Sequence, residues 1–305
     1  MQLSRRYFLL GMAFQICGQD PTFTTDVNVV ALLATVRDRE GHIVKGLNRE
    51  DFLLLDDGTP QTITYFAPEL DLPLTIGLLV DTSRSQIGVL EPERRASYKF
   101  LDQVLREGKD QAFIAHFDVR VEVLQGFTSS RNLLSAALDE LAIPGRYATL
   151  IYECIRSCSE NLMRKQKGRK AFILLSDGVS FLDKASIGTA IEYTQRADTI
   201  IYSILFAESI RPYQPLRGAV EAITSEHGKK VMHRLARETG GAYFEVSQNN
   251  PIEKIYAAIE DALRNQYSIG YLPQQPGKTG EYRRIKLNTK RPGLIVQTRD
   301  GYYVK

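Results

Sequence analysis

The sequence predicts an α/β fold in which a doubly wound, mostly parallel sheet is inserted into a small β unit formed by the two chain ends. Two observations lead to this prediction. In the middle of the chain, near-continuous apolar strands alternate with helical segments, which is typical of a sheet covered on both faces. Near both ends, apolar and polar side chains alternate between turn signals, which is typical of short antiparallel strands. With 43% hydrophobic and 25% charged residues over 305 positions, the composition is that of an ordinary globular chain.

The middle of the chain, residues 70–265, carries the signals of the parallel sheet. Apolar runs predict buried strands at 74–80, 112–117, 171–176, 199–206 and 242–246. Helical periodicity joins them at 91–106, 129–142, 149–162, 184–197, 229–241 and 251–266. Residues 119–125 follow a strand after a tight turn, so they predict an antiparallel edge strand. Pro92 fits a helix start, Ser129 or Ser130 a helix cap, and Gly240-Gly241 a helix stop.

The chain ends, residues 24–69 and 266–305, each predict short strands. The strand-like segments are 25–38, 42–47, 51–66, 266–273, 282–290 and 294–305. Glu40-Gly41 is a turn pair between the first two segments, and Asp57-Gly58 is a turn pair that divides the segment 51–66. Neither end has enough strands to bury a sheet face alone, so we expect both ends to pack together as one β-sandwich.

Residues 1–20 resemble an export signal. Arg5 and Arg6 precede a short apolar run that stops at polar Gln19 and Asp20, and the pattern resembles the twin-arginine type. The run is too short to span a bilayer. We therefore expect an exported protein, periplasmic, on the cell surface or secreted, with no stable membrane span in the mature chain. The alternative is a cytosolic chain with a ragged start.

The charge and cysteine patterns exclude two other classes of protein. The formal net charge is only +3, and no stretch combines dense Lys and Arg with aromatic residues, which argues against nucleic-acid binding. Three cysteines do not make a disulfide framework. Cys154 and Cys158 share one predicted helix face with Ile151 and Ile155, which predicts buried thiols, and no histidine stands at ligand spacing to them.

Small oxygen-bearing side chains gather where the predicted central strands end. Asp81, Ser83 and Ser85 follow the strand at 74–80 as Asp-x-Ser-x-Ser, and Asp177 ends the strand at 171–176. Thr149 stands at the start of a predicted helix. Since ligands of such sheets bind outside the carboxyl ends of the strands, we expect these side chains to share one crevice. Carboxylates and hydroxyls suit Mg²⁺, Mn²⁺ or Ca²⁺ and disfavour softer metals.

The order and spacing of these residues resemble the metal-ion-dependent adhesion site of von Willebrand factor type A domains, whose fold is Rossmann-like. The resemblance covers about residues 70–265. The flanking segments are similar to bacterial proteins related to this family that are widespread in acidobacteria. The resemblance implies hydroxyl ligands from Ser83, Ser85 and Thr149, with Asp81 and Asp177 binding the ion directly or through water.

The resemblance also implies a function, divalent-cation-dependent adhesion to a protein partner that presents an Asp or Glu side chain. Neutral hydroxyl ligands leave the charge of the ion partly uncompensated, so it attracts a further anion. This sequence departs from the family's pattern at Arg84 and Ala148, where glycine is common. The guanidinium of Arg84 could pair with an acidic ligand or repel the cation.

Two other interpretations stay open at this stage. A metal-dependent hydrolase or phosphoryl-transfer enzyme could use the same carboxylates, although the phosphate-loop, dinucleotide, nucleophile-elbow and zinc-protease motifs are missing. We therefore expect a protein that is not an enzyme. Alternatively, Asp81 and Asp177 only accept backbone hydrogen bonds in turns, or the site is a vestigial stabiliser.

Overall fold

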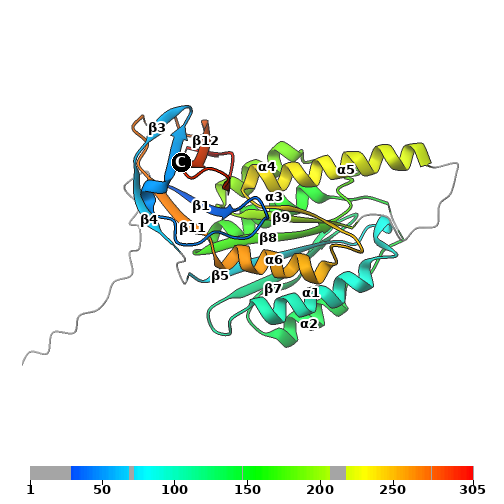
Figure 1. The fold of residues 1–305 in the computed structure, drawn as a ribbon. Coiled ribbons are helices and arrows are strands. Elements are labelled where there is room, and N and C mark those ends of the chain that lie inside the picture. Colours follow the sequence, from blue (N-terminus) through cyan, green and yellow to red (C-terminus); the bar gives the residue numbers. More distant parts are fainter. Residues whose placement is uncertain (1–28, 69–71, 146, 207–217, 276, 305) are drawn as a thin grey trace, which may run out of the picture.

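The computed structural model describes residues 29–68, 72–145, 147–206, 218–275 and 277–304. The predicted export signal, residues 1–20, lies outside the described residues. Figure 1 shows a layered α/β body at one side and a group of antiparallel strands at the other. Among the described residues no helix is both long enough and apolar enough to cross a membrane.

The central sheet has six strands in the order β10-β9-β8-β5-β6-β7. These are β5 Leu74–Asp81, β6 Gln111–Phe117, β7 Val121–Thr128, β8 Arg169–Ser176, β9 Ile200–Phe206 and β10 Tyr243–Val246. All neighbours pair in parallel except β6 and β7, so the predicted antiparallel edge strand is confirmed. The fold is therefore mixed α/β with a central, mostly parallel sheet.

Helices cover both faces of this sheet (Figure 1). On one face, α1 Leu90–Val104, α2 Arg131–Asp139 and α6 Ile252–Arg264 pack on the sheet, and on the other α3 Ile151–Asn161, α4 Ile187–Arg196 and α5 Gly218–Thr239 do so. Strand β5 alternates between the two cores, with Leu78 and Val80 in one and Leu79 in the other. This alternation explains why the strand reads as continuously apolar.

The local signals in the sequence mostly act as expected. Ser130 caps α2 by accepting a hydrogen bond from the Leu133 amide at 3.4 Å, and Gly240 follows α5 with φ of +90°. Helix α5 is a correction, because it begins at Gly218 rather than at residue 229. The sequence does not predict the part of the helix before residue 229, because Gly228 weakens the helix signal there. The observed helix tolerates this glycine.

The two chain ends build two further antiparallel sheets, in the orders β13-β1-β11-β4 and β14-β12-β2-β3. Their strands are β1 Val30–Arg37, β2 Phe52–Asp56, β3 Thr59–Gln61, β4 Ile63–Ala67, β11 Tyr267–Tyr271, β12 Tyr282–Thr289, β13 Ile295–Gln297 and β14 Gly301–Tyr303. Each sheet takes strands from both ends of the chain. Residues of both sheets share one apolar core, in which the ring centroids of Phe52 and Tyr267 are 5.5 Å apart.

Two strand predictions in these sheets were wrong. Residues 42–47 form no strand, and only Ile43 makes a bridge, to Arg37. The single strand predicted at 294–305 is divided into β13 and β14, which belong to different sheets. The division lets Arg299 in the connection donate to Asp198 Oδ1 at 2.9 Å, beyond the end of α4. The end of the chain is thereby held against the α/β body.

Asp56 joins the two chain ends through a buried polar network. Its carboxylate accepts from Arg283 Nε at 2.7 Å, Tyr271 Oη at 2.8 Å and Tyr302 Oη at 3.1 Å. The side chain is completely buried, and that of Arg283 is 8% exposed. Because burying a charge is costly unless it is paired and hydrogen-bonded, this network specifies which strands associate.

We expect Asp56→Ala to lower the free energy of unfolding by about 3–5 kcal/mol, because it leaves the Arg283 guanidinium buried without its partner. Urea denaturation followed by circular dichroism measures the change. The control is Asp139→Ala on the exposed surface of α2, which should stay within about 0.5 kcal/mol of the parent. Equal midpoints for the two variants would contradict the role given to Asp56.

Candidate metal centre

Asp81 is the last residue of β5 and is completely buried at the carboxyl edge of the sheet. Its two carboxylate oxygens are held by different segments. Oδ1 accepts from the Ser83 amide at 2.9 Å, and Oδ2 accepts from Ser176 Oγ at 2.6 Å. Burial first, and then the charge of Asp177, raise the pKa of Asp81 to about 7. A positive ion would relieve both effects.

The two serine hydroxyls of the predicted site lie side by side. Ser83 Oγ and Ser85 Oγ are 2.9 Å apart, and Gln86 Nε2 donates to Ser85 Oγ at 3.1 Å. A short 3-10 turn, Arg84–Gln86, places the second hydroxyl beside the first. The structure therefore brings three of the five predicted residues, at positions 81, 83 and 85, into one hydrogen-bonded group.

Asp177 lies at the neighbouring strand end, since β8 pairs with β5 in parallel and Leu175 is opposite Val80. Its Oδ1 accepts from the Val179 amide at 2.9 Å, which fixes the turn. Gly178 has φ of +77°, and the backbone of α5 at Gly228 lies so close that a Cβ atom at either glycine would clash. Two glycines thus allow α5 to pack directly on the turn that carries Asp177.

Thr149 differs in one detail from the sequence prediction, because it lies two residues before α3 rather than at the helix start. It forms a bridge with Phe181, with the Thr149 amide 2.9 Å from the Phe181 oxygen. Asp183 in the same loop accepts from the Tyr152 amide at 2.7 Å. The segment of Thr149 is therefore tied to the segment that follows Asp177.

A third connection joins Thr149 to the first segment. Asp118 follows β6 and accepts from Thr82 Oγ1 at 2.8 Å through its side chain, while its backbone oxygen accepts from the Leu150 amide at 3.2 Å. Thr82 Oγ1 is also 2.9 Å from His116 Nδ1. All three segments that carry the predicted residues are thus linked by hydrogen bonds at one edge of the sheet.

Three residues around the centre were missed by the sequence reasoning. Ser176 connects Asp81 with the Gly178 amide. Asp118 connects Thr82 with the segment that carries Thr149. Glu93 on α1 is 1% exposed, and neither of its carboxylate oxygens has a hydrogen-bond partner in the described part of the chain. The sequence does contain a signal for Glu93, because it stands at helical spacing from Leu90 and Ser97 on the buried face of α1.

The donor set fits a hard divalent cation only if the hydroxyls take part. Among the described residues no three His, Cys, Asp or Glu side chains are grouped so that they alone could hold a metal. The adjacent serine hydroxyls supply oxygens of the kind that Mg²⁺ and Ca²⁺ prefer. Glu93 and Gln86 also bury oxygens that have no hydrogen-bond partner among the described residues, which fits a bound positive or proton-donating group.

Arg84 projects from the turn between the two serines. Its guanidinium lies over the ring of Tyr147, with Cζ 4.8 Å from the ring centroid. Tyr147 is 67% exposed, so the pair lies at the surface beside the centre.

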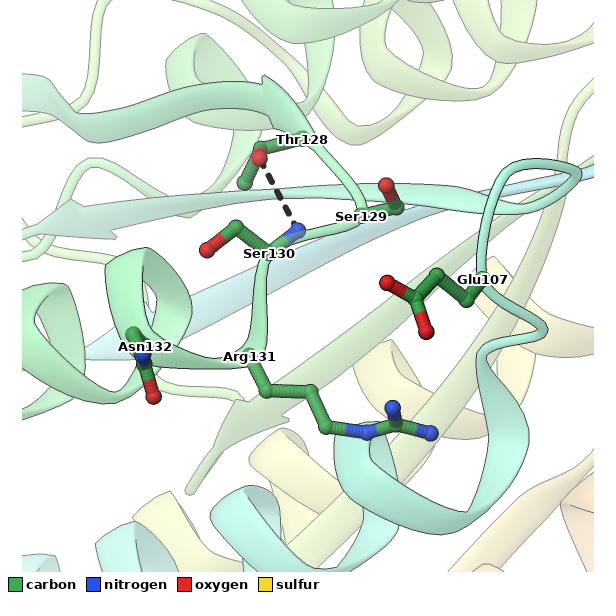
Figure 2. Close-up of a pocket in the computed structure, with 6 residues that line it drawn as sticks. All are labelled: Glu107, Thr128, Ser129, Ser130, Arg131 and Asn132. Atoms are coloured by element: carbon green, nitrogen blue, oxygen red, sulfur yellow. Dashed lines mark hydrogen bonds between the residues drawn. The ribbon is translucent and has the colours of Figure 1, made fainter.

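Two hollows elsewhere on the surface contain none of the five predicted residues. Figure 2 shows the first, with a volume of about 350 Å³, at the opposite end of the sheet where β7 ends. Two of its lining residues already have polar partners, since Thr128 Oγ1 accepts from the Ser130 amide at 3.0 Å and Arg131 pairs with Asp102 at 2.7 Å. The second, about 590 Å³, is lined by Tyr282, Arg284 and neighbours.

Comparison with solved structures shows the fold. Proximal thread matrix protein 1 from the mussel byssus matches with a TM-score of 0.51 and 14% identity, over 74% of this chain and 51% of that one. A structure of the same mussel protein with a zinc-occupied MIDAS motif matches with a TM-score of 0.52 and 14% identity, over 68% and 50%. The chain thus spans about half the length of these mussel chains.

The von Willebrand factor domain of the type V pili tip protein Mfa5 from Porphyromonas gingivalis also matches, with a TM-score of 0.49 and 12% identity over 64% of this chain and 96% of that one. No family model matches the chain, and neither does a curated protein. The fold seen in the structure and in the two mussel matches is that expected of a von Willebrand A domain.

The raised pKa of Asp81 predicts that metal-free protein loses stability as the pH rises. An unfolded aspartate titrates near pH 4, whereas folded Asp81 titrates near 7, so the folded state binds more protons between these values. The free energy of unfolding in EDTA should therefore fall, by on the order of a few kcal/mol, between pH 4 and pH 7. Urea titrations at pH 5 and pH 7.5 measure it.

The matched variant is Asp81→Asn, which removes the titrating carboxyl and keeps its shape. It should show a smaller pH dependence than the parent, and it should be the more stable of the two in EDTA at pH 7.5. Parallel pH profiles for parent and variant would show that this carboxyl is not the source of the dependence.

Proposed function

We propose that this protein binds a divalent cation, Mg²⁺ or otherwise Mn²⁺ or Ca²⁺, and uses it to engage an acidic side chain of a protein partner. The ligands would be the hydroxyls of Ser83, Ser85 and Thr149 with the carboxylates of Asp81 and Asp177. The observation that carries the proposal is the hydrogen-bonded group of Asp81, Ser83 and Ser85 at the carboxyl edge of the sheet, beside the strand end at 177.

The charge balance favours an external anion as the last ligand. The two aspartates already accept hydrogen bonds from Ser176, the Ser83 amide and the Val179 amide, which spreads their negative charge. The remaining ligands in the proposed set are neutral hydroxyls. A cation held in this way would keep part of its charge uncompensated and would attract a carboxylate from outside.

The surface around the centre suits a protein ligand. Large apolar side chains stand exposed on the loops that carry the site, at Ile87 with 64% exposure, Tyr147 with 67%, Phe181 with 53% and Leu182 with 66%. Leu182 also has φ of +60°, an unfavourable conformation for a bulky residue that is more often kept at functional sites. We infer a partner whose acidic residue is flanked by apolar side chains, with Arg84 able to pair with a second acid.

The wider arrangement is also a proposal. We assign residues 24–69 and 266–305 to a β-sandwich that carries residues 70–265 as a von Willebrand A unit. The shared core of the two chain-end sheets supports this assignment. We further propose that the protein is exported, with residues 1–20 as the signal, and that it belongs with the acidobacterial proteins that its flanks resemble. An adhesion-type module would meet its partners outside the cytoplasm.

Thermal melts test cation binding. With Mg²⁺ or Mn²⁺ at about 100 times the dissociation constant, binding should add about 2.7 kcal/mol to the stability measured in EDTA. Ser83→Ala should lose most of this gain because it removes one ligand. Ser129→Ala, in the hollow of Figure 2, is the matched control and should keep it. If the parent protein melts at the same temperature in EDTA and in Mg²⁺ or Mn²⁺, the proposed cation binding is wrong.

A peptide array tests the mode of binding. Peptides with a central Asp or Glu between apolar residues should bind in Mg²⁺, and EDTA or replacement of the acid by its amide should abolish binding. Phe181→Ala should weaken peptide binding at least tenfold and leave the Mg²⁺ stabilisation unchanged. Metal-dependent turnover of p-nitrophenyl phosphate, with no peptide binding, would favour the hydrolase alternative instead.

A further inference from the structure

Glu93 is a buried acid beside the proposed metal centre. It lies in the first turn of α1, and its side chain is directed into the protein with 1% exposure. Glutamate is rarely buried to this extent unless it is paired. Here no described residue forms a hydrogen bond with either oxygen of the carboxyl group. The position therefore costs stability unless something outside the chain satisfies it.

No described side chain donates a hydrogen bond to the carboxyl group of Glu93. Gln86 Oε1 is likewise buried without a partner, while its Nε2 is engaged by Ser85 Oγ. The nearby hydroxyls of Ser97 on α1 and Tyr256 on α6 bond to each other at 2.8 Å. Tyr256 is fixed by stacking on Phe100, with ring centroids 4.4 Å apart. Neither of these two hydroxyls forms a hydrogen bond with Glu93.

The acidic groups of the centre are close enough to act on Glu93. Burial, followed by the charges of Asp81 and Asp177, raises the pKa of Glu93 well above its usual value. No described positive side chain is paired with it, which is unusual for three carboxyl groups that influence one another. A divalent cation near Asp81 and Asp177 would supply the missing positive charge.

We propose that Glu93 is a sixth residue of the metal centre, which accepts a hydrogen bond from a water molecule bound to the cation. This inference rests on the proposed metal site. A metal-bound water gives a lone pair to the ion and donates hydrogen bonds through its two O–H groups, which complements the unpartnered carboxyl oxygens of Glu93. A role through water agrees with the finding that described acidic side chains do not group as direct ligands by themselves.

Isothermal titration of the full chain with Mg²⁺, paired with thermal melts in EDTA, tests the proposal. Glu93→Gln keeps the shape of the side chain and loses its charge, and Glu93→Leu loses both acceptors. We expect a dissociation constant at least tenfold weaker for the glutamine variant and weaker again for the leucine variant. In EDTA both variants should melt at a higher temperature than the parent, because they bury no unpartnered carboxyl group.

Glu91→Gln is the matched control, since Glu91 lies on the same helical turn with 61% of its side chain exposed. It should bind Mg²⁺ as the parent does. If the Glu93 variants are stabilised in EDTA but bind Mg²⁺ with the parent constant, Glu93 is only a strained structural residue and the inference is overturned alone. If the parent shows no Mg²⁺ or Mn²⁺ binding, the proposed function is overturned together with it.

Discussion

The burial of the Asp81 carboxylate at the end of β5 is the constraint on which the rest of the centre depends. A charge in this position is unfavourable without compensation, and in the described residues its compensation is a hydrogen bond from the Ser83 amide and one from the Ser176 hydroxyl. The same hydrogen bonds set the course of the two turns that follow the neighbouring strands. The buried residue that costs stability is therefore also the one that organises the centre, and the cation that we propose would offset this cost on binding.

The sheet topology brings together segments that are far apart in the chain. Parallel pairing of β5 with β8 places two strand ends at one edge, and Asp118 after β6 holds the threonine loop beside them. At the same edge, Gly178 and Gly228 let helix α5 pack against the turn that follows β8. The chain-end sheets lie away from this edge and are held to the α/β body through contacts such as that of Arg299 with Asp198 (Figure 1).

Most of the α/β body could be predicted from the sequence, because strands buried on both faces and capped amphipathic helices leave strong periodic signals. The strand break at 298–300 could not, since local alternation does not reveal that β13 and β14 pair with different sheets. The candidate site likewise has residues that the sequence predicts and residues that only the fold reveals. Asp-x-Ser-x-Ser is visible in the sequence, whereas Ser176 and Glu93 matter only through the contacts that folding creates or leaves unmade.

The most direct measurement is the anomalous diffraction of crystals grown with Mn²⁺. We predict one strong peak at the carboxyl edge of the central sheet, within about 2.0–2.3 Å of the hydroxyl oxygens of Ser83 and Ser85, with a bound water directed at Glu93. A peak at another place, or a Mn²⁺-saturated crystal with no peak between Asp81 and Asp177, would contradict this prediction.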